Sequence, residues 1–264
     1  MNQLPPPAPA AWPPPRRATA PRPQFVERVP ATTLPLPAAV GAIIVLTASL
    51  LASKLLLDLL VDVQWPLVVY VVLLGVTGYG PPLLWCRYAS VRWGSGRVMR
   101  DVGLRPRWSD LAWGPVVWFG AILTQLAMAA IVLALDVPIS NNTEGISELQ
   151  ADRTYVVSLV VTAVIAAPLV EEMVFRGMVL RGLHSRLPIG VALVVQAVLF
   201  GAAHADPVRG VGNVGLVLVL AGVGMAFGVA AHLLRRIGPV VVAHALFNGV
   251  VLVIVLTGVA DDLG

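Results

Sequence analysis

The chain has 264 residues, of which 58% are hydrophobic and only 12% charged, and its mean hydropathy is +0.84. A soluble globular domain has roughly 45–50% apolar and about 25% charged residues, so this composition excludes that class. Each membrane-spanning helix needs about 20 apolar residues, which leaves room for about six to eight spans. The composition therefore predicts an all-α, polytopic integral membrane protein with a bundle of about seven transmembrane helices.

The N-terminal segment 1–37 differs from the rest of the chain. It holds 12 of the 22 prolines, in runs such as 5–7 and 13–15, with arginines between them. Proline interrupts helices, and so few apolar residues cannot form a core, so we expect a disordered tail. The prolines also occupy the place where a signal peptide would carry its apolar stretch.

From Ala38 onward, apolar runs of spanning length recur. We predict seven spans, at 38–61, 66–86, 112–135, 155–175, 188–204, 213–234 and 239–258. The connections between them are expected to be solvated, including the arginine-rich loop 87–107 and the acidic loop 136–153. Within the first span, Lys54 and Asp58 are four residues apart, so we expect them to pair on one helix face.

The basic residues lie on alternate sides of the predicted spans. The tail and the connections at 87–111, 176–187 and 235–238 carry 15 arginines, whereas the opposite side carries Arg153 and Arg209. This asymmetry predicts a cytoplasmic N-terminus and an external C-terminal end near Asp261. The net charge of +4 is spread over short connections and forms no continuous basic face, so we expect contact with the lipid bilayer and none with nucleic acid.

The fourth span ends in three ionisable residues, Glu171, Glu172 and Arg176. Adjacent residues point about 100° apart on a helix, so the two carboxylates have different surroundings. Glu172 and Arg176 are four residues apart and can form an ion pair along one face. Glu171 is left without a helical partner of opposite charge, which suits a general base or acid; a purely structural ion pair is the alternative reading.

Two histidines follow in the later spans. His204 ends the fifth span, four residues after Phe200, and His244 shares a helix face with Asn248 in the seventh. Counting residues from the connecting turns places Glu171 and His204 at a similar depth of about 24 Å, but His244 at only about 9 Å. The count thus favours contact between Glu171 and His204 and separates His244 from both. His184 and His232 are expected to be interfacial.

Together these residues resemble the motifs of a known family. The pair Glu171-Glu172 with Arg176, then Phe200 with His204, then His244 with Asn248 match in order the three motifs of the CPBP intramembrane proteases, also called the Abi family. That group contains the type II CAAX prenyl endopeptidases and the bacteriocin-processing and bacteriocin-immunity proteins. On this resemblance we divide the chain into the tail 1–37, N-terminal transmembrane helices 38–154 and a catalytic transmembrane domain 155–255.

The resemblance implies an intramembrane endopeptidase that acts on a membrane-associated or lipidated peptide or protein. Glu171 would be the base and His204 its partner, while His244 and Asn248 would stabilise the oxyanion and Glu172 with Arg176 would position the helix. The family is also described as metal-dependent, and one carboxylate with two histidines would suit zinc, so a metalloprotease stays open. We favour the metal-free version because Asn248 has a clear oxyanion role.

Other chemistries and functions are weighed against this one. The chain has no His-Glu-x-x-His and no Gly-x-Gly-Asp, and its Gly-Ser-Gly at 94–96 lies in the arginine-rich loop, which disfavours zincin, presenilin-like and rhomboid-like mechanisms. A catalytically silent immunity or interaction protein and a proton-coupled transporter are the alternatives. The strong preference for arginine over lysine indicates a bacterial origin, hence the plasma membrane, and makes a prenylated CAAX substrate less expected than another peptide or membrane protein.

Overall fold

The computed structural model describes residues 34–60, 62–140, 153–206 and 210–257. The predicted tail falls largely outside these ranges, as do most of the acidic loop 136–153, Arg209 and Asp261. Within the described ranges all regular structure is helical, which confirms the predicted fold class. Six of these helical segments are long and apolar enough to cross a membrane, so the chain is a multi-pass membrane protein.

The first helices are α1 (Leu36–Leu60), α2 (Leu67–Trp93), the short α3 (Val98–Asp101) and α4 (Ser109–Ala134). The later ones are α8 (Ile189–Ala202), α9 (Gly212–Leu234) and α10 (Gly238–Thr257). Between α4 and α8, one continuous helical segment runs through α5 (Arg153–Leu159), η2 (Val160–Ala166), α6 (Ala167–Glu172), η3 (Met173–Val179) and α7 (Leu180–His184). Here η2 and η3 are π-helices, whose wider turns are frequent at functional sites.

The fifth predicted span is shorter than expected. Residues 188–204 form the 14-residue α8, which is about 21 Å long and too short for a hydrocarbon core of about 30 Å. The helix ends at Ala202, so His204 lies just beyond it. Its close packing on α9 depends on glycine, because a Cβ at Gly201 would collide with the Val217 carbonyl oxygen and one at Gly224 would lie 3.1 Å from that of Ala197.

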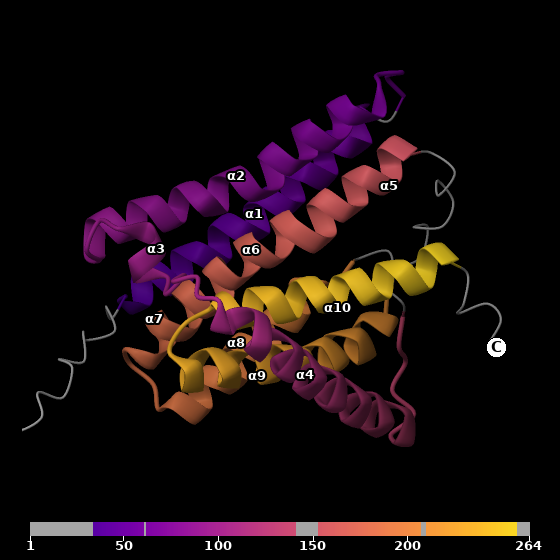
Figure 1. Cartoon of the computed structure of the whole chain (residues 1–264). Coiled ribbons are helices and arrows are strands. Elements are labelled where there is room, and N and C mark those ends of the chain that lie inside the picture. Colours follow the sequence, from indigo (N-terminus) through magenta and orange to yellow (C-terminus); the bar gives the residue numbers. More distant parts are fainter. Residues whose placement is uncertain (1–33, 61, 141–152, 207–209, 258–264) are drawn as a thin grey trace, which may run out of the picture. The chain divides into compact units, whose positions relative to one another are not determined.

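The segment Arg153–His184 is surrounded by the other helices. It packs against α1 and α2 on one side and against α10, α8 and α9 on the other (Figure 1). Consequently Val174, Phe175 and Met178 of η3 are fully buried. A helix that is apolar all round is stable only in such an environment, and this position places Glu171 and Glu172 at the centre of the bundle.

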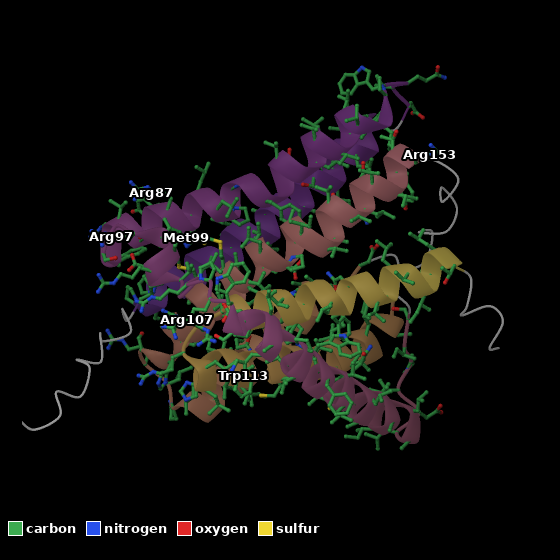
Figure 2. All side chains as sticks on the ribbon, viewed as in Figure 1. Arg87, Arg97, Met99, Arg107, Trp113 and Arg153 are labelled. Carbon is green, nitrogen blue, oxygen red and sulfur yellow. The ribbon has the colours of Figure 1, made fainter. Side chains whose placement is uncertain are left out.

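The arginines gather at one end of the helices. Figure 2 shows Arg87, Arg97 and Arg107 at this end and Arg153 at the other. We call it the arginine-rich end; it comprises the connection 94–108, the C-terminal part of α7 and the turn between α9 and α10.

The connection at 94–108 is packed, so the expectation of a solvated loop was wrong. Asp101 is fully buried and accepts hydrogen bonds from the hydroxyls of Ser90, at 2.6 Å, and Ser95, at 2.7 Å. The guanidinium of Arg181 donates to the Asp101 carbonyl at 2.9 Å. Buried polar groups need such partners, and the loop obtains them by folding onto the helix ends. Only Trp108, 91% exposed, keeps the expected surface position.

The predicted pair of Lys54 and Asp58 is also wrong. The Lys54 ammonium lies 3.2 Å from the Asp206 carboxylate, whereas Asp58 is exposed on α1. Asp206 follows the end of α8 and is brought to α1 by the tertiary fold. Helical spacing alone carries no information about such a distant competitor.

Candidate active site

Glu171 and Glu172 end α6, between the two π-helices. Their side chains enter different surroundings, as the sequence predicts. The Glu171 side chain is 18% exposed, whereas that of Glu172 is fully buried.

The Glu172 carboxylate is held by two donors. Its Oε1 accepts hydrogen bonds from Arg176 Nη1 at 2.8 Å and from His244 Nδ1 at 2.9 Å. The Arg176 guanidinium is also fully buried, donates to the Gly224 carbonyl at 3.1 Å and lies over the ring of Phe200 at 4.4 Å. The predicted ion pair is therefore present and has a further member, His244, from α10.

These hydrogen bonds determine which histidine nitrogens are free. Because Glu172 accepts from His244 Nδ1, the neutral ring of His244 leaves Nε2 without a proton. His204 Nδ1 donates to the Phe200 carbonyl at 2.8 Å, so its Nε2 is likewise free. Both tautomers are thus set by groups that can only accept.

The two free nitrogens face Glu171. His204 Nε2 lies 3.9 Å and His244 Nε2 4.0 Å from Glu171 Oε2. This oxygen is buried and has no hydrogen-bond partner within the described part of the chain. Three acceptors therefore surround one small space, and we call Glu171, His204 and His244 the triad.

The expected separation of His244 from the other two residues was wrong. Ile237 N–H donates to the Gly103 carbonyl at 3.1 Å, and the neighbouring Val102 packs against Gly177 of η3. The turn before α10 is therefore level with Gly177 and not with the later turn at 185–188. Measured from that level, Glu171 and His244 are each about six residues, or about 9 Å, along their helices.

Asn248 lies one turn beyond His244 and has a different contact. Its Nδ2 donates to the Ala163 carbonyl at 2.7 Å. In η2 the Ala167 N–H bonds to the Thr162 carbonyl, and the next residue, Pro168, has no N–H to offer Ala163. Asn248 supplies this missing donor and is not hydrogen-bonded to a triad member in the described structure. The second N–H of its amide is the group that an oxyanion role would require.

The triad does not fit a zinc centre. Two ligands at about 2.1 Å from a tetrahedral zinc ion are about 3.4 Å apart, less than the 3.9 and 4.0 Å found here. Over the described ranges, no three His, Cys, Asp or Glu side chains are grouped so that they could hold a metal ion.

Two residues near the site were missed by sequence reasoning. Gln196 of α8 is fully buried and donates to the same Gly224 carbonyl as Arg176, at 2.9 Å. A lone amide in an otherwise apolar run was the available signal. Tyr79 of α2 lies within electrostatic reach of Glu171, and no local pattern indicated this because the two are 92 residues apart.

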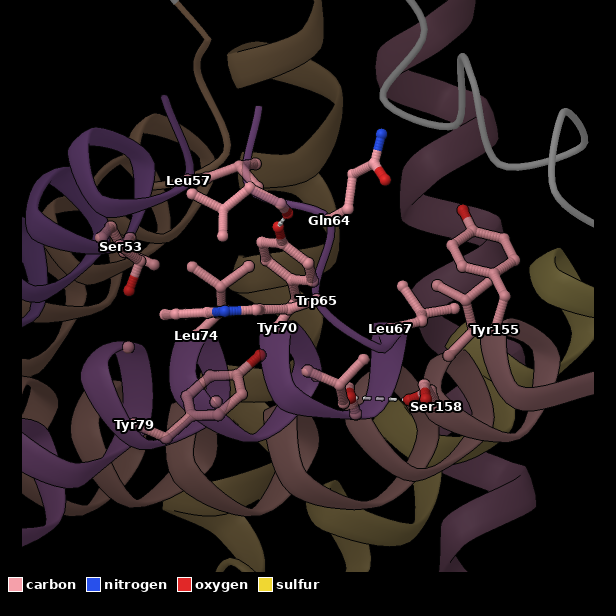
Figure 3. A pocket seen from close by; sticks show the side chains of 17 residues that line it. Ser53, Leu57, Gln64, Trp65, Leu67, Tyr70, Leu74, Tyr79, Tyr155 and Ser158 are labelled. Carbon is pink, nitrogen blue, oxygen red and sulfur yellow. Dashed lines mark hydrogen bonds between the residues drawn. The ribbon is translucent and has the colours of Figure 1, made fainter. Parts of the chain in front are cut away.

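An apolar cavity of about 940 Å³ lies between α1, α2 and α5. Figure 3 shows Trp65, Tyr70 and Tyr79 on one side of it and Tyr155 and Ser158 of α5 on the other. Tyr79, which lines this cavity, also interacts electrostatically with Glu171. The cavity is therefore adjacent to the triad.

Comparison with known families gives one match. Residues 153–250 match the family model of the Rce1-like type II CAAX prenyl endopeptidases. The chain belongs to the CPBP, or CAAX protease, family. All three motifs predicted from the sequence lie inside the matched segment, and the resemblance inferred from them is confirmed. Searches of curated proteins and of solved structures gave no match.

The CAAX protease segment comprises the helices from α5 to most of α10. At the level of the family, the chain is a CAAX-type intramembrane protease. Helices α1, α2 and α4 lie outside the matched segment, and α1 and α2 form much of the wall of the apolar cavity.

Proposed function

We propose that this protein is an intramembrane endopeptidase that hydrolyses a peptide bond of a membrane-associated or lipidated peptide or protein. The observation that carries the proposal is the approach of two free histidine nitrogens to Glu171 Oε2, at 3.9 and 4.0 Å. Two groups that hydrogen-bond the same water molecule at about 2.8 Å have such a separation. A water at this point would touch a base and two imidazoles.

In the proposed reaction, Glu171 and His204 orient the water. As its oxygen bonds to the carbonyl carbon of the substrate, one proton passes to Glu171 and the carbonyl oxygen becomes an oxyanion. Glu171 then delivers this proton to the amide nitrogen, the carbon–nitrogen bond breaks, and an amine and a carboxylic acid are released. No step is routed through a metal.

His244 and Asn248 are the proposed donors to the oxyanion. His244 can donate only when Nε2 carries a proton, and the Glu172 carboxylate on Nδ1 favours this imidazolium form. Arg176 holds Glu172 in place for this purpose. The free N–H of the Asn248 amide would be the second donor.

The arrangement of charges supports a location and an orientation. We place the protein in a bacterial plasma membrane with the arginine-rich end in the cytoplasm, because arginines gather at that end. The apolar cavity would take the apolar part of the substrate next to the triad.

The proposal is tested with labelled membrane and lipidated peptides and the purified protein in detergent. We expect cleavage of at least one peptide, and the same rate after treatment with a chelator. The release of a new amine and a new carboxylate, followed by mass spectrometry, measures the reaction. Loss of activity on chelation, restored by zinc, would contradict the metal-free mechanism.

Filling the apolar cavity should weaken substrate binding. Gly75 lines the cavity, and a Cβ there would meet no atom within 4 Å, so Gly75→Phe can be accommodated without a backbone clash. We expect KM to rise by about tenfold or more, with a smaller change in kcat, in steady-state cleavage assays. Gly120→Phe on α4 is the matched control, since a Cβ there also meets nothing within 4 Å. Equal KM values for the two variants would place the substrate elsewhere.

A further inference from the structure

A second cavity, of about 590 Å³, lies at the arginine-rich end. It is bounded by the end of α7, the start of α8 and the turn between α9 and α10. Its charged and titratable lining is entirely basic within the described ranges, and comprises Arg176, Arg181, His184, His232 and Arg235. We call this the basic cavity.

Three of these basic residues are available to a ligand. Arg176 is paired with Glu172, and Arg181 donates to the Asp101 carbonyl. His184, His232 and Arg235, by contrast, are exposed and have no acidic partner among the described residues. Their positive potential is therefore uncompensated by the protein, which favours an anion.

The geometry brings these three groups to one place. The rings of His184 and His232 lie edge to face with centroids 6.0 Å apart. His184 Nδ1 contacts the Leu187 carbonyl at 3.2 Å, which leaves Nε2 for a ligand. Arg235 directly follows α9 with a φ of 57°, a left-handed conformation in which helices usually carry glycine. An arginine retained at such a position suggests a role for its side chain.

The remaining lining is apolar and lies where a lipid chain begins. Leu180, Ile189 and Leu233 contribute to the cavity, and Leu233 is 71% exposed. The cavity also lies at the ends of two spanning helical segments, which end at His184 and Leu234. A ligand that fits both parts has an anionic head and an apolar chain.

We propose that the basic cavity binds an anionic phospholipid, with the phosphate at His184, His232 and Arg235 and an acyl chain along Leu180 and Leu233. Basic pockets between transmembrane helices at a membrane surface bind such headgroups. Arg176 forms part of the cavity and also holds Glu172, so a bound lipid stabilises the end of the bundle that supports the triad.

Native mass spectrometry of the detergent-purified full chain tests this proposal. With equimolar phosphatidylglycerol and phosphatidylcholine, we expect one phosphatidylglycerol to be retained preferentially. The variant His232→Gln/Arg235→Gln should reduce this bound fraction by about tenfold. Arg186→Gln, which removes an exposed arginine near the cavity but not lining it, is the matched control and should retain the lipid.

Further arms separate the remaining explanations. Arg235→Lys keeps the charge and should keep most of the binding, and its folding is checked by its melting temperature. Inorganic phosphate at millimolar concentration should not displace the lipid; full displacement would indicate a site for a soluble phosphate and overturn the proposal. Equal retention of both lipids, or equal loss in the Arg186 variant, would also overturn it. No peptide substrate is present, so the result is independent of the proposed peptidase activity.

Discussion

Replacing Glu171 with glutamine is expected to lower kcat/KM for peptide cleavage by about 10³-fold or more. The amide cannot take a proton from water, and general base catalysis contributes about 10²–10⁴-fold. Folding should be preserved, because Glu171 Oε2 has no hydrogen-bond partner in the described structure and glutamine has the same shape. Cleavage kinetics and the melting temperature measured on the same preparation check both expectations.

Asp58→Asn is the matched control for this variant. It makes the same change from acid to amide at an exposed position on α1, away from the triad, and should leave kcat/KM unchanged. If Glu171→Gln retained the wild-type rate while both variants fold, Glu171 would not be the base. Glu172 does not replace it, because its Oε1 is already occupied by Arg176 and His244.

The second large effect is expected from Arg176→Met. This change leaves the fully buried Glu172 carboxylate without its cation, and breaking a buried ion pair in this way costs about 3–5 kcal/mol. Activity should fall as well, because Glu172 positions His244. The free energy of unfolding can be measured by titration with a denaturing detergent in mixed micelles.

A double-mutant cycle separates pairing from packing. The double variant Glu172→Gln/Arg176→Met buries no unpaired charge, so it should be clearly more stable than Arg176→Met alone. Arg186→Met, at an exposed position of the same end, is the control and should change stability by less than about 0.5 kcal/mol. Additive effects of the two single changes would show that the two side chains do not stabilise each other.

The local features of this protein were predictable from the sequence. Apolar runs of about 20 residues identified the long spanning helices, because a membrane requires internally hydrogen-bonded helices of that length. Helical spacing identified the pair of Glu172 and Arg176, which depends only on residues one turn apart. The same spacing predicted that Glu171 faces elsewhere. The segment that matches the CAAX protease family carries all the motifs found in this way.

What the sequence by itself determined was therefore the set of helices and the contacts within a helical turn, since both follow from local periodicity. The tertiary structure decided which elements meet. The folding of residues 102–103 against Gly177 and Ile237 sets the level of α10 and brings His244 to Glu171. Asn248 reaches Ala163 because Pro168 leaves that carbonyl without a donor. Such contacts depend on helix ends and on residues far apart in the chain, which helical periodicity does not encode.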